Sequence, residues 1–103
     1  MGIHSVAVVG QGYVGLPLSM KIASAGFIVY GIDTNKELIT NLKSGVSNIA
    51  DVDSKEVLEA ISKGAYIPSS SYDVLSKVDA IIICVPTPLD EHKIVFSFVL
   101  YSL

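Results

Sequence analysis

The feature that most constrains how this 103-residue sequence can fold is the stretch from Val6 to Pro17. Four apolar residues lead into the pattern G-x-G-x-x-G, and an apolar helical periodicity follows directly. A strand, a glycine-rich turn and a helix in this order are typical of the phosphate-binding turn of dinucleotide-binding domains. In that arrangement Gly10 permits the sharp turn, Gly12 leaves room for a pyrophosphate beside the backbone, and Gly15 lets the helix pack closely.

A second strand and an acidic residue follow at the spacing that this interpretation requires. Residues 27–32 predict a strand, and Asp33 stands at its end. In dinucleotide-binding domains an acid about 20 residues beyond the glycines binds the ribose hydroxyls. We therefore expect Asp33 to bind the adenosine ribose, with a solvated strand-end carboxylate or a helix N-terminal charge as the alternatives. Thr34 and Glu37 form a T-x-x-E pattern, which predicts a capping box for the next helix.

The remaining periodicity predicts an α/β fold. Helices are expected over residues 13–25, from 34 to about 44, and from Asp53 or Ser54 to Gly64, and a short helix is expected to end at about residue 77. Further strands are expected over residues 4–9, 66–67 and 80–85, and Pro86 is expected to end the last of them. These elements make a partial doubly wound, Rossmann-type parallel sheet with strand order 3-2-1-4. The expected domain covers residues 1–93 and is incomplete, and the apolar residues 94–103 start a next helix or remain from a truncation. Strand four would then lack a neighbour on one edge, which predicts self-association or marginal stability.

Charge, cysteine content and hydropathy restrict the partners and the compartment. A net charge of −3 disfavours nucleic-acid binding. The seven basic residues are all lysines, which favours NAD over NADP because arginine commonly binds the extra 2′-phosphate. The single cysteine excludes an internal disulfide and indicates a reducing compartment. Because there is no signal-peptide pattern and the apolar run over 94–100 is too short to span a bilayer, we expect a cytoplasmic protein without a membrane partner.

Other residues that could carry chemistry have plainer interpretations. Cys84 lies inside an apolar run, where a buried thiol is inert, so it is not expected to be a nucleophile. His4 and His92 have no second ligand at metal spacing, so no metal site is expected. Thr87 follows the last predicted strand, where ligands bind in open α/β sheets, and a loop-capping hydroxyl is its alternative role.

Three segments of the sequence resemble the N-terminal NAD-binding part of the UDP-glucose/GDP-mannose 6-dehydrogenase family. They are residues 10–17, 31–33 and 84–89, which read GQGYVGLP, GID and CVPTPL. Residues 47–49 are most similar to the branch that oxidises UDP-N-acetylhexosamines. The resemblance implies NAD as cofactor and oxidation of the C6 alcohol of a UDP-sugar to a carboxylate in two NAD-dependent steps. It also implies a homo-oligomer and a place in nucleotide-sugar metabolism and polysaccharide biosynthesis.

Carried over residue by residue, the resemblance implies a set of cofactor contacts. Tyr13 and Val14 would contact the pyrophosphate through their backbone, and Thr87 would line the nicotinamide side. The family's catalytic cysteine, its lysines and its sugar-binding domain lie downstream of the matched positions. This sequence is therefore expected to hold no catalytic residue and to be inactive alone. Two alternatives stay open: a non-catalytic NAD-binding module or remnant, and a Rossmann dehydrogenase of the 3-hydroxyacid type.

Overall fold

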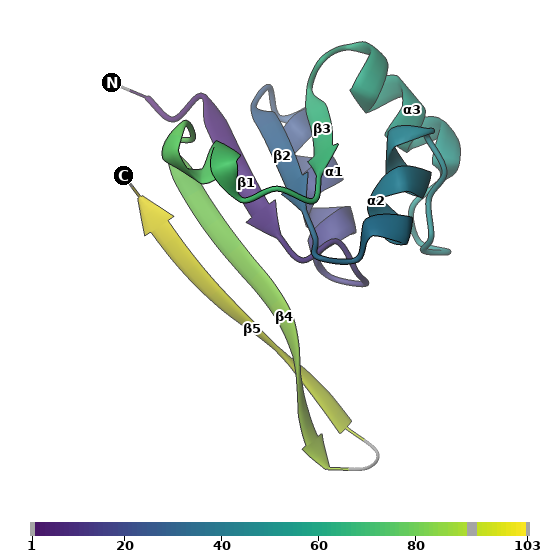
Figure 1. Cartoon of the computed structure of the whole chain (residues 1–103), viewed down its shortest axis with the longest axis vertical. Coiled ribbons are helices and arrows are strands. Elements are labelled where there is room, and N and C mark those ends of the chain that lie inside the picture. The colour runs from purple at the N-terminus through teal and green to yellow at the C-terminus, as the bar shows by residue number, and fades with distance from the viewer. Residues whose placement is uncertain (1, 91–92, 103) are drawn as a thin grey trace.

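The chain folds around one mixed sheet in which parallel strands alternate with helices (Figure 1). The computed structural model describes residues 2–90 and 93–102. The elements are β1 (Ser5–Val9), α1 (Gly15–Ser24), β2 (Ile28–Ile32), α2 (Lys36–Lys43), α3 (Ser54–Ser62), β3 (Tyr66–Ser69), the 3₁₀-helix η1 (Asp73–Ser76), β4 (Ala80–Asp90) and β5 (Lys93–Ser102). The α/β class predicted from the sequence is confirmed.

The strand order is β3-β2-β1-β4-β5. The first four strands are parallel to one another, which confirms the predicted order 3-2-1-4. Val9, the last residue of β1, pairs with Ile32 on one side and with Ile83 on the other. The carboxyl ends of β1 and β2 therefore meet at one edge of the sheet, where open α/β sheets bind ligands.

The two faces of the sheet are covered differently. Residues of β1 alternate between two apolar clusters, with Val8 in the first and Ala7 in the second, so these clusters lie on opposite faces. Side chains of α1, α2 and α3 belong to the first cluster, whereas the second is covered by η1. Right-handed crossovers that step from β1 to β2 to β3 place all their helices on one face, and the return to β4 crosses the other.

The C-terminal part of the chain differs from its prediction. Pro86 does not end the strand, because β4 continues to Asp90 and pairs with an antiparallel β5. Beyond Ile83 the strand has no β1 residue beside it, so the missing N–H of Pro86 costs no ladder hydrogen bond on that side. The expected helix start after residue 93 is also wrong: residues 93–102 form β5, which covers the edge of β4 that was expected to be unpaired. Aromatic and β-branched residues dominate this segment and favour a strand.

The α-helices begin and end close to the predicted positions, with one different cap. Asp53 caps α3 through a hydrogen bond from the Lys55 N–H, as one of the two predicted alternatives. The cap of α2 is Asn35 and not Thr34, because the Asn35 side chain accepts the Leu38 N–H at 3.1 Å. The capping box predicted from the T-x-x-E pattern is therefore not formed.

Candidate functional site: the glycine turn at the end of β1

The turn between β1 and α1 requires glycine at two positions. Gly10 has a φ of +98°, and its N–H donates to the carbonyl of Ile32 at 2.6 Å, which ties the turn to the end of β2. A Cβ on Gly10 would overlap the main-chain carbonyl of Cys84. A Cβ on Gly15 would overlap the carbonyl of Gly10. These glycines bring the first turn of α1 against the end of the strand, and backbone atoms fill the space that side chains would need.

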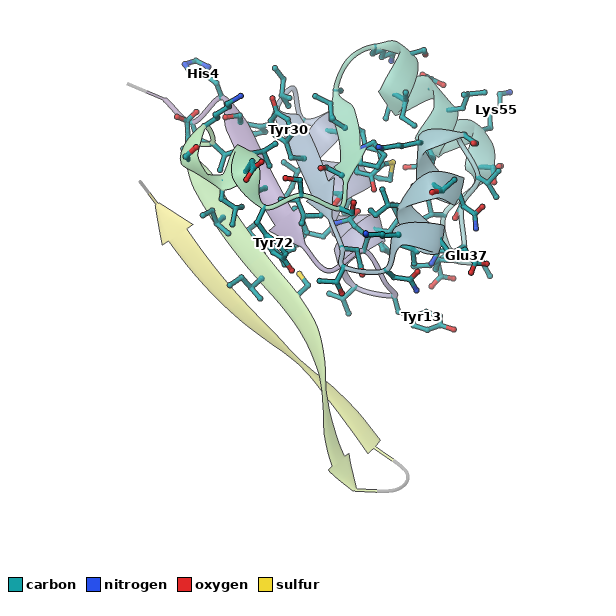
Figure 2. All side chains as sticks on the ribbon, viewed as in Figure 1. His4, Tyr13, Tyr30, Glu37, Lys55 and Tyr72 are labelled. Atoms are coloured by element: carbon teal, nitrogen blue, oxygen red, sulfur yellow. The ribbon has the colours of Figure 1, made fainter. Side chains whose placement is uncertain are left out.

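The outer side of the same turn is open. A Cβ on Gly12 would meet no atom within 4 Å. Among the described residues, no acceptor takes the main-chain N–H of Tyr13 or of Val14, and the N-terminus of α1 has no side-chain cap. The Tyr13 side chain is 74% exposed and extends away from the body of the molecule (Figure 2). Free amides at a helix N-terminus, beside a glycine with open space, are suited to bind a phosphate group.

Asp33 lies beside this turn at the end of β2. Its Oδ2 accepts the main-chain N–H of Gln11 at 2.9 Å, and its Oδ1 accepts the N–H of Asn35 at 3.0 Å. Each carboxylate oxygen has two lone pairs, so each keeps one acceptor position. The half-buried carboxylate can therefore accept hydrogen bonds from two neighbouring hydroxyls, which is the chemistry of a ribose diol.

Beneath the turn lies a polar network that the sequence patterns do not predict. Gln11 is fully buried, and its Nε2 donates to the carbonyls of Val8 at 2.9 Å and Gly10 at 3.2 Å. The same Nε2 lies 3.1 Å from the Oγ of Ser19. The hydroxyl of Tyr66 donates to the Gln11 Oε1 at 2.5 Å. Gln11 and Tyr66 lie 55 residues apart, so only the tertiary structure brings them together.

Gly31 provides the space for this network. A Cβ on Gly31 would lie 2.6 Å from the Tyr66 hydroxyl and 2.7 Å from the Gln11 Oε1. Burial raises the pKa of the Tyr66 phenol well above its usual range, and the negative charge of Asp33 raises it further. The phenol therefore stays protonated and remains a hydrogen-bond donor. The only signal in the sequence was the glycine that precedes Ile32 and Asp33, which the resemblance had marked without giving it a role.

Two predicted residues of β4 lie apart from the turn. Cys84 is buried, as predicted, and burial raises the pKa of its thiol, which lowers the thiolate fraction at neutral pH. Thr87 was expected after the end of a strand, but it lies within β4, beyond Ile83 and opposite Val95 in β5. Its side chain lies outside the described residues, and its contact with the nicotinamide stays a prediction.

The described residues also form features away from the glycine turn. A hollow of about 370 Å³ between α1 and α3 is lined by residues such as Met20, Glu56 and Lys63, and it includes none of the predicted cofactor residues. No group of three potential metal ligands occurs in the part of the chain that the structure describes. His92, one of the two histidines considered above, lies outside that part. No helix among the described residues is long and apolar enough to cross a membrane.

The parallel order 3-2-1-4, the glycine turn and the strand-end Asp33 together define a dinucleotide-binding domain of the Rossmann type. Residues 4–100 match the sequence profile of the UDP-glucose/GDP-mannose dehydrogenase family, NAD binding domain. The chain therefore belongs to this family of oxidoreductases, and its cofactor is NAD.

Known relatives agree with this assignment. The chain is 41% identical over 88 residues to the UDP-N-acetyl-D-glucosamine 6-dehydrogenase of Pseudomonas aeruginosa, a match that covers 85% of this chain and 20% of that protein. It is 36% identical over 94 residues to a UDP-N-acetyl-D-mannosamine dehydrogenase of Methanococcus maripaludis, covering 88% of this chain and 21% of that protein. The structure of the UDP-D-ManNAc dehydrogenase of Pyrococcus horikoshii superposes with a TM-score of 0.77 at 35% identity, over 87% of this chain and 22% of that one. The chain thus spans about a fifth of the length of these relatives.

Proposed function

We propose that this chain is the cofactor-binding part of a nucleotide-sugar 6-dehydrogenase that oxidises the C6 alcohol of a UDP-N-acetylhexosamine to a carboxylate. The relatives named above are dehydrogenases of UDP-N-acetylglucosamine and UDP-N-acetylmannosamine, which supports this substrate class. A homo-oligomer, a cytoplasmic location and a role in polysaccharide biosynthesis complete the proposal. The lone cysteine, typical of proteins in a reducing compartment, supports the location.

The proposal assigns the cofactor contacts to the glycine turn and Asp33. The pyrophosphate lies against Gly12 and accepts the main-chain N–H groups of Tyr13 and Val14, with the positive end of the α1 dipole behind them. The Asp33 carboxylate accepts the hydroxyls of the adenosine ribose. The same carboxylate repels a 2′-phosphate, which favours NAD over NADP. Bound NAD supplies the hydride acceptor for the oxidation, and the residues of this chain bind and orient it.

The observation that carries the proposed binding of NAD is the position of Asp33, whose carboxylate is hydrogen-bonded to the turn itself through the Gln11 N–H. Isothermal titration calorimetry with NAD and NADP tests it. We expect the chain to bind NAD more tightly than NADP, and we expect Asp33→Asn to weaken NAD binding and reduce this preference. Equal affinities of the wild-type chain for NAD and NADP would contradict the assignment of Asp33.

The role of this chain in catalysis needs a test in a complete enzyme. In a suitable chimera, this chain replaces the 88 matched residues of the Pseudomonas aeruginosa UDP-N-acetyl-D-glucosamine 6-dehydrogenase. We expect the chimera to reduce NAD in the presence of UDP-N-acetylglucosamine, and we expect Asp33→Asn to abolish most of this activity. A chimera that folds and binds NAD but oxidises no UDP-sugar would contradict the proposed role of this chain as the cofactor-binding part of such a dehydrogenase and leave NAD binding intact.

The 103-residue chain alone is expected to bind NAD without oxidising UDP-sugars. Its one thiol, on Cys84, is buried and protonated, so it cannot serve as the nucleophile of a covalent mechanism. An assay of NAD reduction with UDP-N-acetylglucosamine checks this. Measurable turnover by the chain alone would contradict it.

A further inference from the structure

The orientation of the buried Gln11 side chain follows from its neighbours. The carbonyls of Val8 and Gly10 can only accept hydrogen bonds, so the carboxamide must turn its Nε2 toward them. This leaves the Oε1 facing the Tyr66 hydroxyl, which must then donate its proton. A buried acceptor without a donor is costly. The Tyr66 hydroxyl lies 2.5 Å from the Gln11 Oε1 and the Ser19 Oγ lies 3.3 Å from it, so Tyr66 makes the shorter of the two contacts that fix the orientation of the Gln11 side chain.

Ser19 connects the same side chain to α1. The Ser19 Oγ donates to the carbonyl of Gly15 at 2.8 Å. It also lies 3.1 Å from the Gln11 Nε2, whose two protons are shared among this oxygen and the carbonyls of Val8 and Gly10. In the described residues, no buried side-chain nitrogen or oxygen lacks a hydrogen-bond partner. The network therefore links the end of β1, the turn, the first turn of α1 and β3 through one fully bonded side chain. Fully satisfied buried networks of this kind hold one local arrangement.

We propose that Gln11 is a positioning residue, and that Tyr66 and Ser19 hold its side chain so that its main-chain N–H fixes the carboxylate of Asp33 for the cofactor ribose. The contact that carries this inference is the hydrogen bond of 2.9 Å from the Gln11 N–H to the Asp33 Oδ2. The side chain and the main chain of one residue thus serve two purposes: the first anchors the turn, and the second orients the acid. The inference rests on the proposed binding of NAD at Asp33.

The first test needs no cofactor. Tyr66→Phe keeps the ring and removes only the hydroxyl that donates to Gln11, and Tyr72→Phe is the control because Tyr72 is 47% exposed (Figure 2). Amide hydrogen exchange of the Gln11 N–H is followed by NMR. In Tyr66→Phe we expect exchange about three- to tenfold faster, the factor that corresponds to one hydrogen bond, and in Tyr72→Phe no change. Unchanged exchange in Tyr66→Phe would overturn the inference whether or not the chain binds NAD.

The second test separates positioning from a purely structural role. The affinities for NAD and for an analogue that lacks the 2′-hydroxyl of the adenosine ribose are measured by calorimetry. We expect Tyr66→Phe to weaken NAD binding about three- to tenfold and to change binding of the analogue less than about twofold, because the analogue makes less use of Asp33. Ser19→Ala should behave in the same way. Ser24→Ala is its control, since Ser24 donates to the carbonyl of Lys21 on the exposed side of α1.

The outcomes are distinguishable. An equal loss of affinity for NAD and for the analogue would mean that the network only maintains the fold, and it would overturn the inference. A wild-type chain that binds neither compound would overturn the proposed function, and the exchange of the Gln11 amide would still decide whether the network positions the turn. Thermal unfolding of each variant identifies any that fails to fold. In that case Ser19→Ala replaces Tyr66→Phe in both measurements.

Discussion

Gly12 and Gly15 belong to one turn, but an added methyl group would meet different surroundings at each. At Gly15 it would overlap the carbonyl of Gly10, and backbone atoms cannot move aside without separating α1 from β1. At Gly12 it would meet no protein atom within 4 Å. The sequence pattern does not distinguish the two glycines. The structure shows that Gly15 is required for packing of the helix, whereas Gly12 leaves space for a ligand.

This difference gives a matched pair of substitutions. Gly15→Ala should destabilise the fold by about 1–3 kcal/mol, the range for overpacked sites, and thermal unfolding measures it. Gly12→Ala should change stability by less than about 0.5 kcal/mol, as at open surface positions. It should still weaken NAD binding by about tenfold or more, because the methyl group occupies the space of the pyrophosphate. Unchanged NAD affinity in Gly12→Ala would show that the pyrophosphate binds elsewhere.

A second residue-scale prediction concerns Asp79, which precedes β4. Its Oδ2 accepts the N–H groups of His4 at 2.8 Å and Ser5 at 3.1 Å, and these hydrogen bonds lower the pKa of the carboxyl group. Because the pKa is lower in the folded state, the stabilisation is present above the unfolded value of about 3.9 and is lost as the pH falls through the folded value. Asp79→Asn should therefore lower Tm at pH 7, and the difference from wild type should shrink below about pH 4. The exposed Asp73→Asn is the control, and a difference that persists in acid would contradict this origin.

At the scale of elements, the start of α2 depends on Asp33 as well as on its own cap. The Asp33 Oδ1 accepts the N–H of Asn35 in a local turn, and the helix begins directly after this turn at Lys36. Asn35 rather than Thr34 then stands where its side chain can accept the Leu38 N–H. The cofactor acid and the helix cap are therefore parts of one local structure.

The cap can be tested directly. Asn35→Ala should destabilise the protein by about 1 kcal/mol, the usual cost of a lost N-cap. Thr34→Ala should change the free energy of unfolding by less than about 0.5 kcal/mol, because Thr34 is exposed and is not the cap. Urea unfolding at equal protein concentration compares the two variants. A larger loss of unfolding free energy in Thr34→Ala than in Asn35→Ala would contradict the assignment of Asn35 as the cap and support the capping box that the sequence predicts.

Some of these elements could be predicted from the sequence and others could not. Apolar runs, glycines and chain order were sufficient for the parallel order 3-2-1-4 and for the glycine turn beside Asp33, because these signals are local. The network of Gln11 and Tyr66 was not predictable, since it depends on which side chain of a distant strand reaches the turn. Pro86 was taken as a strand end because its neighbours in the sheet were unknown, and a proline beside an unpaired edge is tolerated.

At the scale of the whole molecule, the two edges of the sheet are not equivalent. β3 is a four-residue strand that contains Pro68, and short edges with proline resist pairing with another chain. β5 is a ten-residue strand with one charged residue, Lys93, in its sequence. It pairs with β4 along its length, and the two strands extend together beyond the parallel sheet (Figure 1). The unpaired edge on this side of the sheet therefore belongs to β5 and not, as expected, to β4.

Self-association is therefore still expected, but through β5. A long, apolar edge strand offers a row of backbone groups to a second copy, and a lysine within the strand opposes such pairing. Sedimentation velocity should show a larger species as the concentration rises, and Val95→Lys should shift the distribution toward the monomer. Val46→Lys adds the same charge at an exposed position between α2 and α3 and should not change it. If the wild-type chain stays monomeric at every concentration, or if both variants dissociate equally, β5 does not carry the association.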